Sequence, residues 1–167
     1  MADLFDPAWG SKPGRAVVHQ LHPPHRLSNV NPEQLRAARE MVEIAAVTAR
    51  YNIGDRTAAA LLAAAEEASV AFSPWYPTTV ANQDGNAAHL GDVFGPICEK
   101  HQATVPQLAL AWLLHRSPFM LPIPGTSSLT HLEENLGAAA IDLTAEEVDA
   151  ITQLVPDDSS PAPDGGR

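Results

Sequence analysis

The stretch NPEQLRAAREMVEIAAVT, residues 31–48, decides the fold class of this 167-residue chain. Asn31 can cap a helix, Pro32 suits the first helical position, and Gln34 can complete a capping box. A helix is therefore expected from about residue 32 to residue 40. The short apolar run EIAAVT, residues 43–48, follows it and is typical of a buried parallel strand.

The same alternation continues on both sides of this stretch. Two more capping boxes, Thr104 with Gln107 and Thr144 with Glu147, mark helix starts. Short strands are expected at residues 16–21, 70–73 and 120–123, and helices at 57–68, 92–101, 106–116, 128–139 and 144–154. Pro74 is expected to close the strand at 70–73, and Pro23 and Pro24 to exclude residues 22–26 from a central strand. The order of elements predicts a parallel α/β sheet.

Composition bounds the partners and the domain organisation. The net charge of −10 and the scattered Lys and Arg residues argue against nucleic acid. No apolar run approaches the roughly 18 residues of a membrane span, so we expect no membrane partner. Cys98 is the only cysteine and the first 15 residues contain no leader-like apolar region, which favours a cytoplasmic location. One domain is expected at residues 17–155, between a disordered head (1–16) and tail (156–167).

Five segments carry a resemblance to a known family. They are LSNVNPEQL (27–35), AAVTARYNIGDR (45–56), VAFSPWYP (70–77), QLALAWLLHRSP (107–118) and LPIPGTSSLTHLEENL (121–136). In order and spacing they resemble the second half of the aldo/keto reductases. The resemblance implies a TIM-type (β/α) barrel, here incomplete and roughly the C-terminal half, because a full barrel typically needs about 250 residues. It also implies NAD(P)H-dependent reduction of a small-molecule carbonyl substrate.

The resemblance implies that most of the catalytic machinery is missing. The family uses a tyrosine as general acid, tuned by a lysine and an aspartate, and a histidine that orients the carbonyl. Only His22 matches one of these positions, and it is otherwise one polar residue in a His-rich loop. We therefore expect a truncated, catalytically impaired oxidoreductase. The alternative is a non-catalytic half-barrel that binds nucleotide weakly or pairs with another chain, for which a homodimer through open sheet edges is an option.

The cofactor side of the family site is better matched. The resemblance assigns Ser28 and Asn29 to the nicotinamide carboxamide and Trp75 to stacking on the nicotinamide. Read without the resemblance, Trp75 is a core aromatic residue at the end of a strand. Thr48 stands where the family has a glutamine, so one carboxamide contact is lost.

The adenosine end falls after the strand expected at 120–123. Gly125, Thr126 and Ser127 open a helix, where backbone N–H groups favour a phosphate, and the family binds the 2′-phosphate there. Glu134 and Asn135 match the pair at the adenine, although they also read as a solvated helix face. Gly125 and His131 stand where many members have a lysine and an arginine. NADP is the expected cofactor, with NAD as the alternative.

A metal site is not expected. His19, His22 and His25 are regularly spaced, but Pro23 and Pro24 prevent helical presentation and no Cys or acidic ligand is near in sequence. Structural zinc usually recruits four such ligands.

Overall fold

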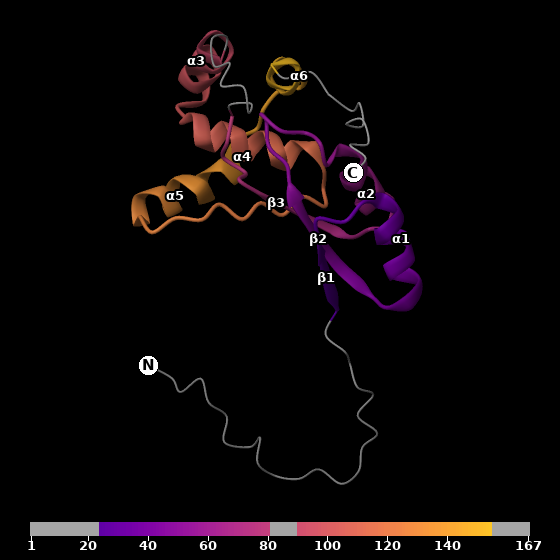
Figure 1. Cartoon of the computed structure of the whole chain (residues 1–167). Helices are drawn as coiled ribbons and strands as arrows, with labels where there is room; N and C mark the ends of the chain where they lie inside the picture. The colour runs from indigo at the N-terminus through magenta and orange to yellow at the C-terminus, as the bar shows by residue number, and fades with distance from the viewer. Residues whose placement is uncertain (1–23, 81–89, 155–167) are drawn as a thin grey trace, which may run out of the picture.

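The computed structural model describes residues 24–80 and 90–154 (Figure 1). The elements are β1 (His25–Ser28), α1 (Pro32–Met41), β2 (Ile44–Arg50), α2 (Ala59–Glu67), β3 (Ala71–Trp75), α3 (Leu90–His101), α4 (Val105–Arg116), α5 (Leu129–Gly137), a 3-10 turn (Ala138–Ala140) and α6 (Ala145–Gln153). The strand expected at 16–21, the head and tail, and His19 and His22 lie outside the described residues.

The three strands form one sheet in the order β1-β2-β3, and all pairs are parallel, as the alternation of strands and helices predicts. Leu27, Val47 and Phe72 occupy one row of the register. Side chains alternate between the faces of a strand, so Ser28, Thr48 and Ser73, which form the next row, point to the opposite face. The apolar row packs into the main hydrophobic core.

The strand predicted at residues 120–123 is not formed as such. Met120 makes only an isolated parallel bridge to Phe72. The N–H of Phe72 donates to the carbonyl of Phe119 at 2.8 Å, and the N–H of Leu121 donates to the carbonyl of Phe72 at 2.8 Å. In a parallel ladder the next bond would run from the nitrogen of residue 74 to the carbonyl of Leu121. Pro74 has no N–H to donate, so the ladder does not continue beyond Leu121.

Two strands lie beside or across prolines. β1 begins at His25, inside the segment that Pro23 and Pro24 were expected to exclude from a central strand. Pro23 and Pro24 come before the first residue of β1, and β1 lies at one end of the described sheet. Prolines are tolerated next to a strand at the end of a sheet because no second partner strand needs their N–H groups. β3 continues through Pro74 to Trp75. The backbone N–H and carbonyl of Phe72 bond to residues 119 and 121, on the side of β3 that faces away from β2. Backbone groups two residues apart in a strand face the same side, so the nitrogen of Pro74 also faces away from β2. The missing N–H of Pro74 therefore costs no hydrogen bond between β3 and β2.

The helices begin where the sequence indicates. Asn31 with Gln34, Thr104 with Gln107 and Thr144 with Glu147 all form complete capping boxes. α1 and α2 lie together on one flank of the strands (Figure 1). No helix in residues 24–80 and 90–154 is long and apolar enough to cross a membrane.

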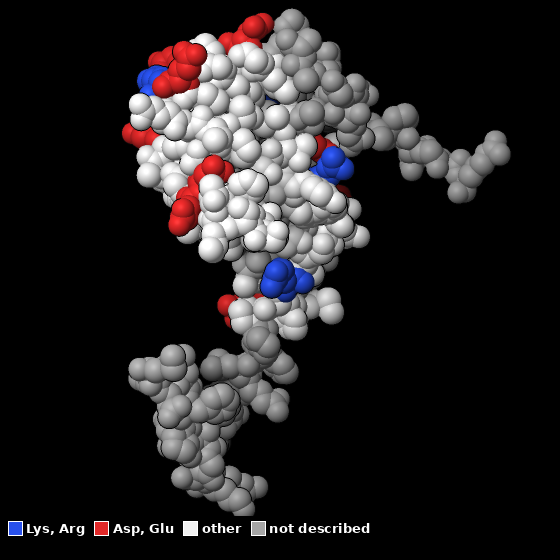
Figure 2. Space-filling view, turned by 90° about the vertical axis from the view of Figure 1, so that its left-hand side faces the viewer, with Lys and Arg blue, Asp and Glu red and all other residues white. Residues whose placement is uncertain are grey.

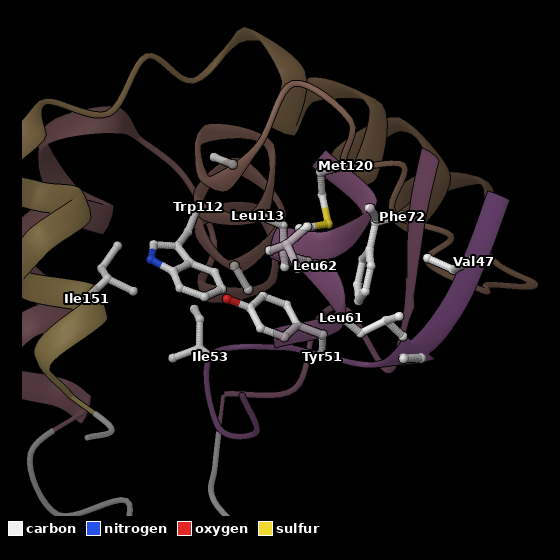
Figure 3. Packing of buried hydrophobic residues seen from close by; sticks show 14 of the residues in the cluster. Val47, Tyr51, Ile53, Leu61, Leu62, Phe72, Trp112, Leu113, Met120 and Ile151 are labelled. Carbon is white, nitrogen blue, oxygen red and sulfur yellow. The ribbon is translucent and has the colours of Figure 1, made fainter. Parts of the chain in front are cut away.

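Aromatic side chains occupy the centre of the core (Figure 3). The ring of Tyr51 lies edge-on to Phe72, with centroids 5.8 Å apart, and stacks on Trp112 at 6.1 Å. The indole Nε1–H of Trp112 donates a 3.0 Å hydrogen bond to the hydroxyl of Thr152. This contact ties α4 to α6. The core therefore joins the sheet to the C-terminal helices and fixes the strand ends in place.

Candidate functional site

The carboxyl ends of the parallel strands meet at one edge of the sheet, where α/β proteins commonly bind ligands. The N–H of Asn29 donates to the carbonyl of Thr48 at 2.9 Å, which extends the pairing just beyond β1. A cavity of about 320 Å³ opens at this edge. It is lined by Asn29, Val30, Asn31, Pro32, Ala49, Arg50, Thr57, Ala58, Ala60, Leu61 and Trp75.

A row of hydroxyl side chains crosses the sheet near this edge. Ser28 pairs in register with Thr48, and Thr48 with Ser73. Ser28 is exposed, Thr48 half-buried and Ser73 buried. Hydroxyls both donate and accept hydrogen bonds, so this face offers polar contacts without charge.

Trp75 lies between Arg50 and Tyr76 at the end of β3. Arg50 is its register partner on β2, and the Trp75 and Tyr76 rings are 5.7 Å apart. The guanidinium of Arg50 lies 5.5 Å from the centre of the Tyr76 ring, and its Nε lies 3.1 Å from a carboxylate oxygen of Asp55. Trp75 is half-buried, so part of its ring surface is accessible. The group combines flat aromatic surfaces with one ion-paired cation.

A second cavity of about 370 Å³ lies where the chain leaves residue 123 and enters α5. Its lining residues are Thr78, Thr104, Pro106, Pro124, Gly125, Thr126, His131, Glu134 and Asn135. Most of the side chains are polar and uncharged. Glu134 is the only Asp, Glu, Lys or Arg residue in that lining.

Local hydrogen bonds shape the second cavity. The hydroxyl of Thr126 accepts from the N–H of Ser128 at 3.1 Å, and the hydroxyl of Ser128 caps α5 by accepting from the N–H of His131 at 3.4 Å. The side-chain amide of Gln107 donates to the carbonyl of Glu134 at 3.0 Å. α4 thereby holds α5, and Glu134 and Asn135 are half-buried rather than fully solvated.

The structure brings most of the expected cofactor residues into these two groups. Asn29 and Trp75 line the first cavity. Gly125, Thr126, His131, Glu134 and Asn135 line the second. Ser28 and Ser127 line neither, and the catalytic candidate His22 lies outside the described residues.

Other lining residues were not singled out from the sequence. Arg50 and Thr57 belong to the first cavity, and Thr78 and Thr104 to the second. Arg50 ends β2, two residues beyond the strand predicted at 43–48, and its closeness to a predicted strand end was a usable signal. Thr104 was recognised only as a helix cap, and nothing in the sequence places it beside residue 126.

Charged surface patches and clusters of metal-ligating side chains are two other features that could form a site in the described part of the chain. The surface seen in Figure 2 is largely uncharged, with scattered acidic side chains. Residues 24–80 and 90–154 contain no group of three His, Cys, Asp or Glu side chains that could hold a metal ion. His25 is in β1, and His19 and His22, which precede it at regular spacing in the sequence, lie outside the described residues.

Comparison with known proteins gives one family. The model described as "Aldo/keto reductase family" matches residues 26–156. Over 120 residues the chain is 37% identical to an oxidoreductase of Schizosaccharomyces pombe and 39% identical to pyridoxine 4-dehydrogenase of Escherichia coli. Each match covers 72% of this chain and 38% or 40% of the relative, so the chain spans about two fifths of the length of these relatives.

A solved structure of an aldo-keto reductase is also similar to this chain. An aldo-keto reductase from Klebsiella pneumoniae in complex with NADPH has a TM-score of 0.68 and 26% sequence identity. The match covers 77% of this chain and 46% of the other.

Proposed function

The chain belongs to the aldo/keto reductase family, its fold is a partial α/β barrel, and from this premise we propose that it forms the nicotinamide-dinucleotide side of a carbonyl reductase. The observation that carries the proposal is the pair of cavities at the end of β3, where Trp75 lines the first and Thr78, three residues on, lines the second. A reduced nicotinamide supplies the hydride in such a reaction. NADP(H) is the proposed cofactor, with NAD(H) as the alternative.

The residues proposed to hold the nicotinamide end come from all three strands. Asn29 and the hydroxyl of Ser28 offer donors and acceptors to a carboxamide, and Trp75 offers a flat ring surface. The hydroxyl row from Ser28 to Ser73 fits a neutral polar ring system, because it adds hydrogen-bonding groups without charge.

The residues proposed to hold the adenosine end surround the second cavity. Thr126 and the first turn of α5 present donors toward a phosphate, assisted by the partial positive charge of the helix start. Gly125, Ser127 and His131 belong to the same turn and first helical residues. Glu134 and Asn135 offer an acceptor and an amide toward an adenine.

The described residues 24–80 and 90–154 place no tyrosine, lysine or histidine, the expected proton donors for carbonyl reduction, in the lining of the first cavity. Loss of a general acid costs roughly 10²- to 10⁴-fold in rate. We therefore propose that these 167 residues by themselves bind nucleotide but reduce carbonyl compounds poorly.

Two measurements on the 167-residue chain test this proposal. Quenching of tryptophan fluorescence by NADPH and NADH reports binding, and the Trp75→Phe variant shows how much of the signal comes from Trp75. Oxidation of NADPH with a panel of aldehydes reports turnover. Binding without turnover supports the proposal. Absence of binding by a folded chain refutes it, and efficient turnover refutes the impairment.

Self-association is a second proposal with its own support. Within the described sheet β1 pairs only with β2, and an unpaired strand edge can add another strand. Large apolar side chains also lie exposed on residues 121–136, namely Leu121, Ile123, Leu129, Leu132 and Leu136. Light scattering across a range of protein concentrations tests for a homodimer, and a monomer at all concentrations would exclude it.

A further inference from the structure

The segment from Trp75 to Thr78 links a residue of the first cavity to a residue of the second. Trp75 lines the first cavity and Thr78 lines the second. Between them Tyr76 has a φ of 55°, in the left-handed region that non-glycine residues rarely occupy. The relative placement of the two cavity walls therefore depends on a backbone conformation that tyrosine does not favour by itself.

The side chain of Asn52 holds this conformation. Its Nδ2 donates a 3.1 Å hydrogen bond to the carbonyl of Tyr76, and the N–H of Thr79 donates to the same carbonyl at 3.2 Å. The Tyr76 side chain is 60% exposed, so burial does not fix it. Asn52 is fully buried and lies in the loop between β2 and α2, outside the lining of either cavity.

Asn52 is itself held in place by its own loop. Its Oδ1 accepts from the N–H of Gly54 at 2.9 Å, and its backbone N–H donates to the carbonyl of Asp55 at 2.9 Å. One end of the amide must therefore accept and the other must donate. Aspartate, which is similar in size, cannot donate when ionised.

We propose that Asn52 is a positioning residue that fixes the segment from Trp75 to Thr78, and with it the placement of one cavity relative to the other, so that one dinucleotide can occupy both cavities at once. This inference rests on the proposed function. It predicts a selective effect: a ligand that reaches both cavities needs their relative placement, whereas a ligand that occupies one cavity does not.

Calorimetric titration of the 167-residue chain and its Asn52→Ala and Asn52→Asp variants tests the selectivity. The probes are NADPH, which spans both cavities, and adenosine 2′,5′-bisphosphate, which reaches only the second. We expect the Kd of NADPH to rise roughly 5- to 30-fold, the effect of one lost buried hydrogen bond. The Kd of the bisphosphate should change less than about twofold. Equal changes for both probes would overturn the proposal.

A matched control separates positioning from general loss of stability. Thr152→Val removes the hydrogen bond from Trp112, which also joins distant elements, and Thr152 lines neither cavity. This variant should lower the unfolding temperature without changing the ratio of the two Kd values. A ratio that shifts as much in Thr152→Val as in Asn52→Ala would count against a role for Asn52.

A stability cycle tests the contact without any nucleotide. Glycine adopts positive φ readily, so Tyr76→Gly should remove much of the need for Asn52. The loss of unfolding free energy on Asn52→Ala should be smaller in the Tyr76→Gly background. Equal losses in both backgrounds would overturn the proposal. Failure of the wild-type chain to bind NADPH would refute the proposed function, and this cycle would still decide whether Asn52 holds Tyr76.

Discussion

The ammonium group of Lys100, near the end of α3, donates a 2.7 Å hydrogen bond to the carboxylate of Glu147, in the first turn of α6. The other carboxylate oxygen lies 3.0 Å from Nε2 of His101 and accepts from the N–H of Thr144 at 2.9 Å. Glu147 therefore closes the capping box of α6 and fastens that helix to α3.

The acid stability of the chain should depend on Glu147. Burial raises the pKa of its carboxyl, but the hydrogen bonds from Lys100, the Thr144 N–H and His101 outweigh burial and lower the pKa to about 2. Because the folded-state pKa lies below the ordinary value of 4.5, the stabilisation is complete above pH 4.5 and is lost as the pH falls toward 2. Glu147→Gln should lose about 0.5–1 kcal/mol of unfolding free energy at pH 7 after solvent screening.

Urea unfolding at pH 7 and pH 3 measures the effect of Glu147→Gln, and the exposed Glu133→Gln serves as control. The prediction would be contradicted if the free energy of unfolding changed between pH 7 and pH 3 by the same amount in Glu147→Gln as in the wild type.

The hydroxyl of Tyr51 should destabilise the core. Tyr51 is fully buried, and within the described residues its hydroxyl has no hydrogen-bond partner, although its ring packs well between Phe72 and Trp112 (Figure 3). Tyr51→Phe keeps the ring and removes the unsatisfied group, so the free energy of unfolding should rise by about 1 kcal/mol. Urea denaturation measures the change. Trp112→Phe is the contrast, because it breaks the bond to Thr152 and should lower stability. A loss of stability in Tyr51→Phe would show that the hydroxyl has a partner.

Trp75 should contribute to nucleotide affinity through its ring. Trp75→Ala should raise the Kd of NADPH about 3- to 10-fold, because stacking of a flat ring is lost. Trp75→Phe keeps an aromatic surface and should have a smaller effect. Calorimetric titration is the suitable measurement, since the substitution removes the fluorescent reporter. Equal affinity of the alanine variant and the wild type would assign Trp75 a packing role only.

Gly125 offers a direct test of cofactor preference. A Cβ built on Gly125 meets no atom within 4 Å, so a substitution causes no clash at the Cβ position. Gly125→Lys should raise the affinity for NADPH relative to NADH about tenfold at low salt, because it brings a cation to the proposed 2′-phosphate position. Gly125→Gln, of similar length but uncharged, is the matched control. The gain should shrink at high ionic strength. An equal gain for NADH would place the phosphate elsewhere.

The sequence by itself determined the local structure of this protein. Helix starts at Asn31, Thr104 and Thr144 follow from capping chemistry that acts within four residues, and all three formed as predicted. The parallel pairing of β2 with β3 followed from the alternation of strands with helices, whereas β1 was not among the strands expected from that pattern. The family resemblance, carried by motifs in a fixed order along the sequence, is confirmed.

Only the tertiary structure decided what residues far apart in the chain do together. The contact from Asn52 to Tyr76 joins two loops, and a one-dimensional pattern carries no signal for such a hydrogen bond. The predicted strand at 120–123 is reduced to a bridge because Pro74 of β3 faces this segment and has no N–H to donate. Thr104 reads as a helix cap in sequence and becomes a wall of the second cavity in space. Local hydrogen bonds are encoded by neighbours, whereas a cavity is set by how whole elements pack.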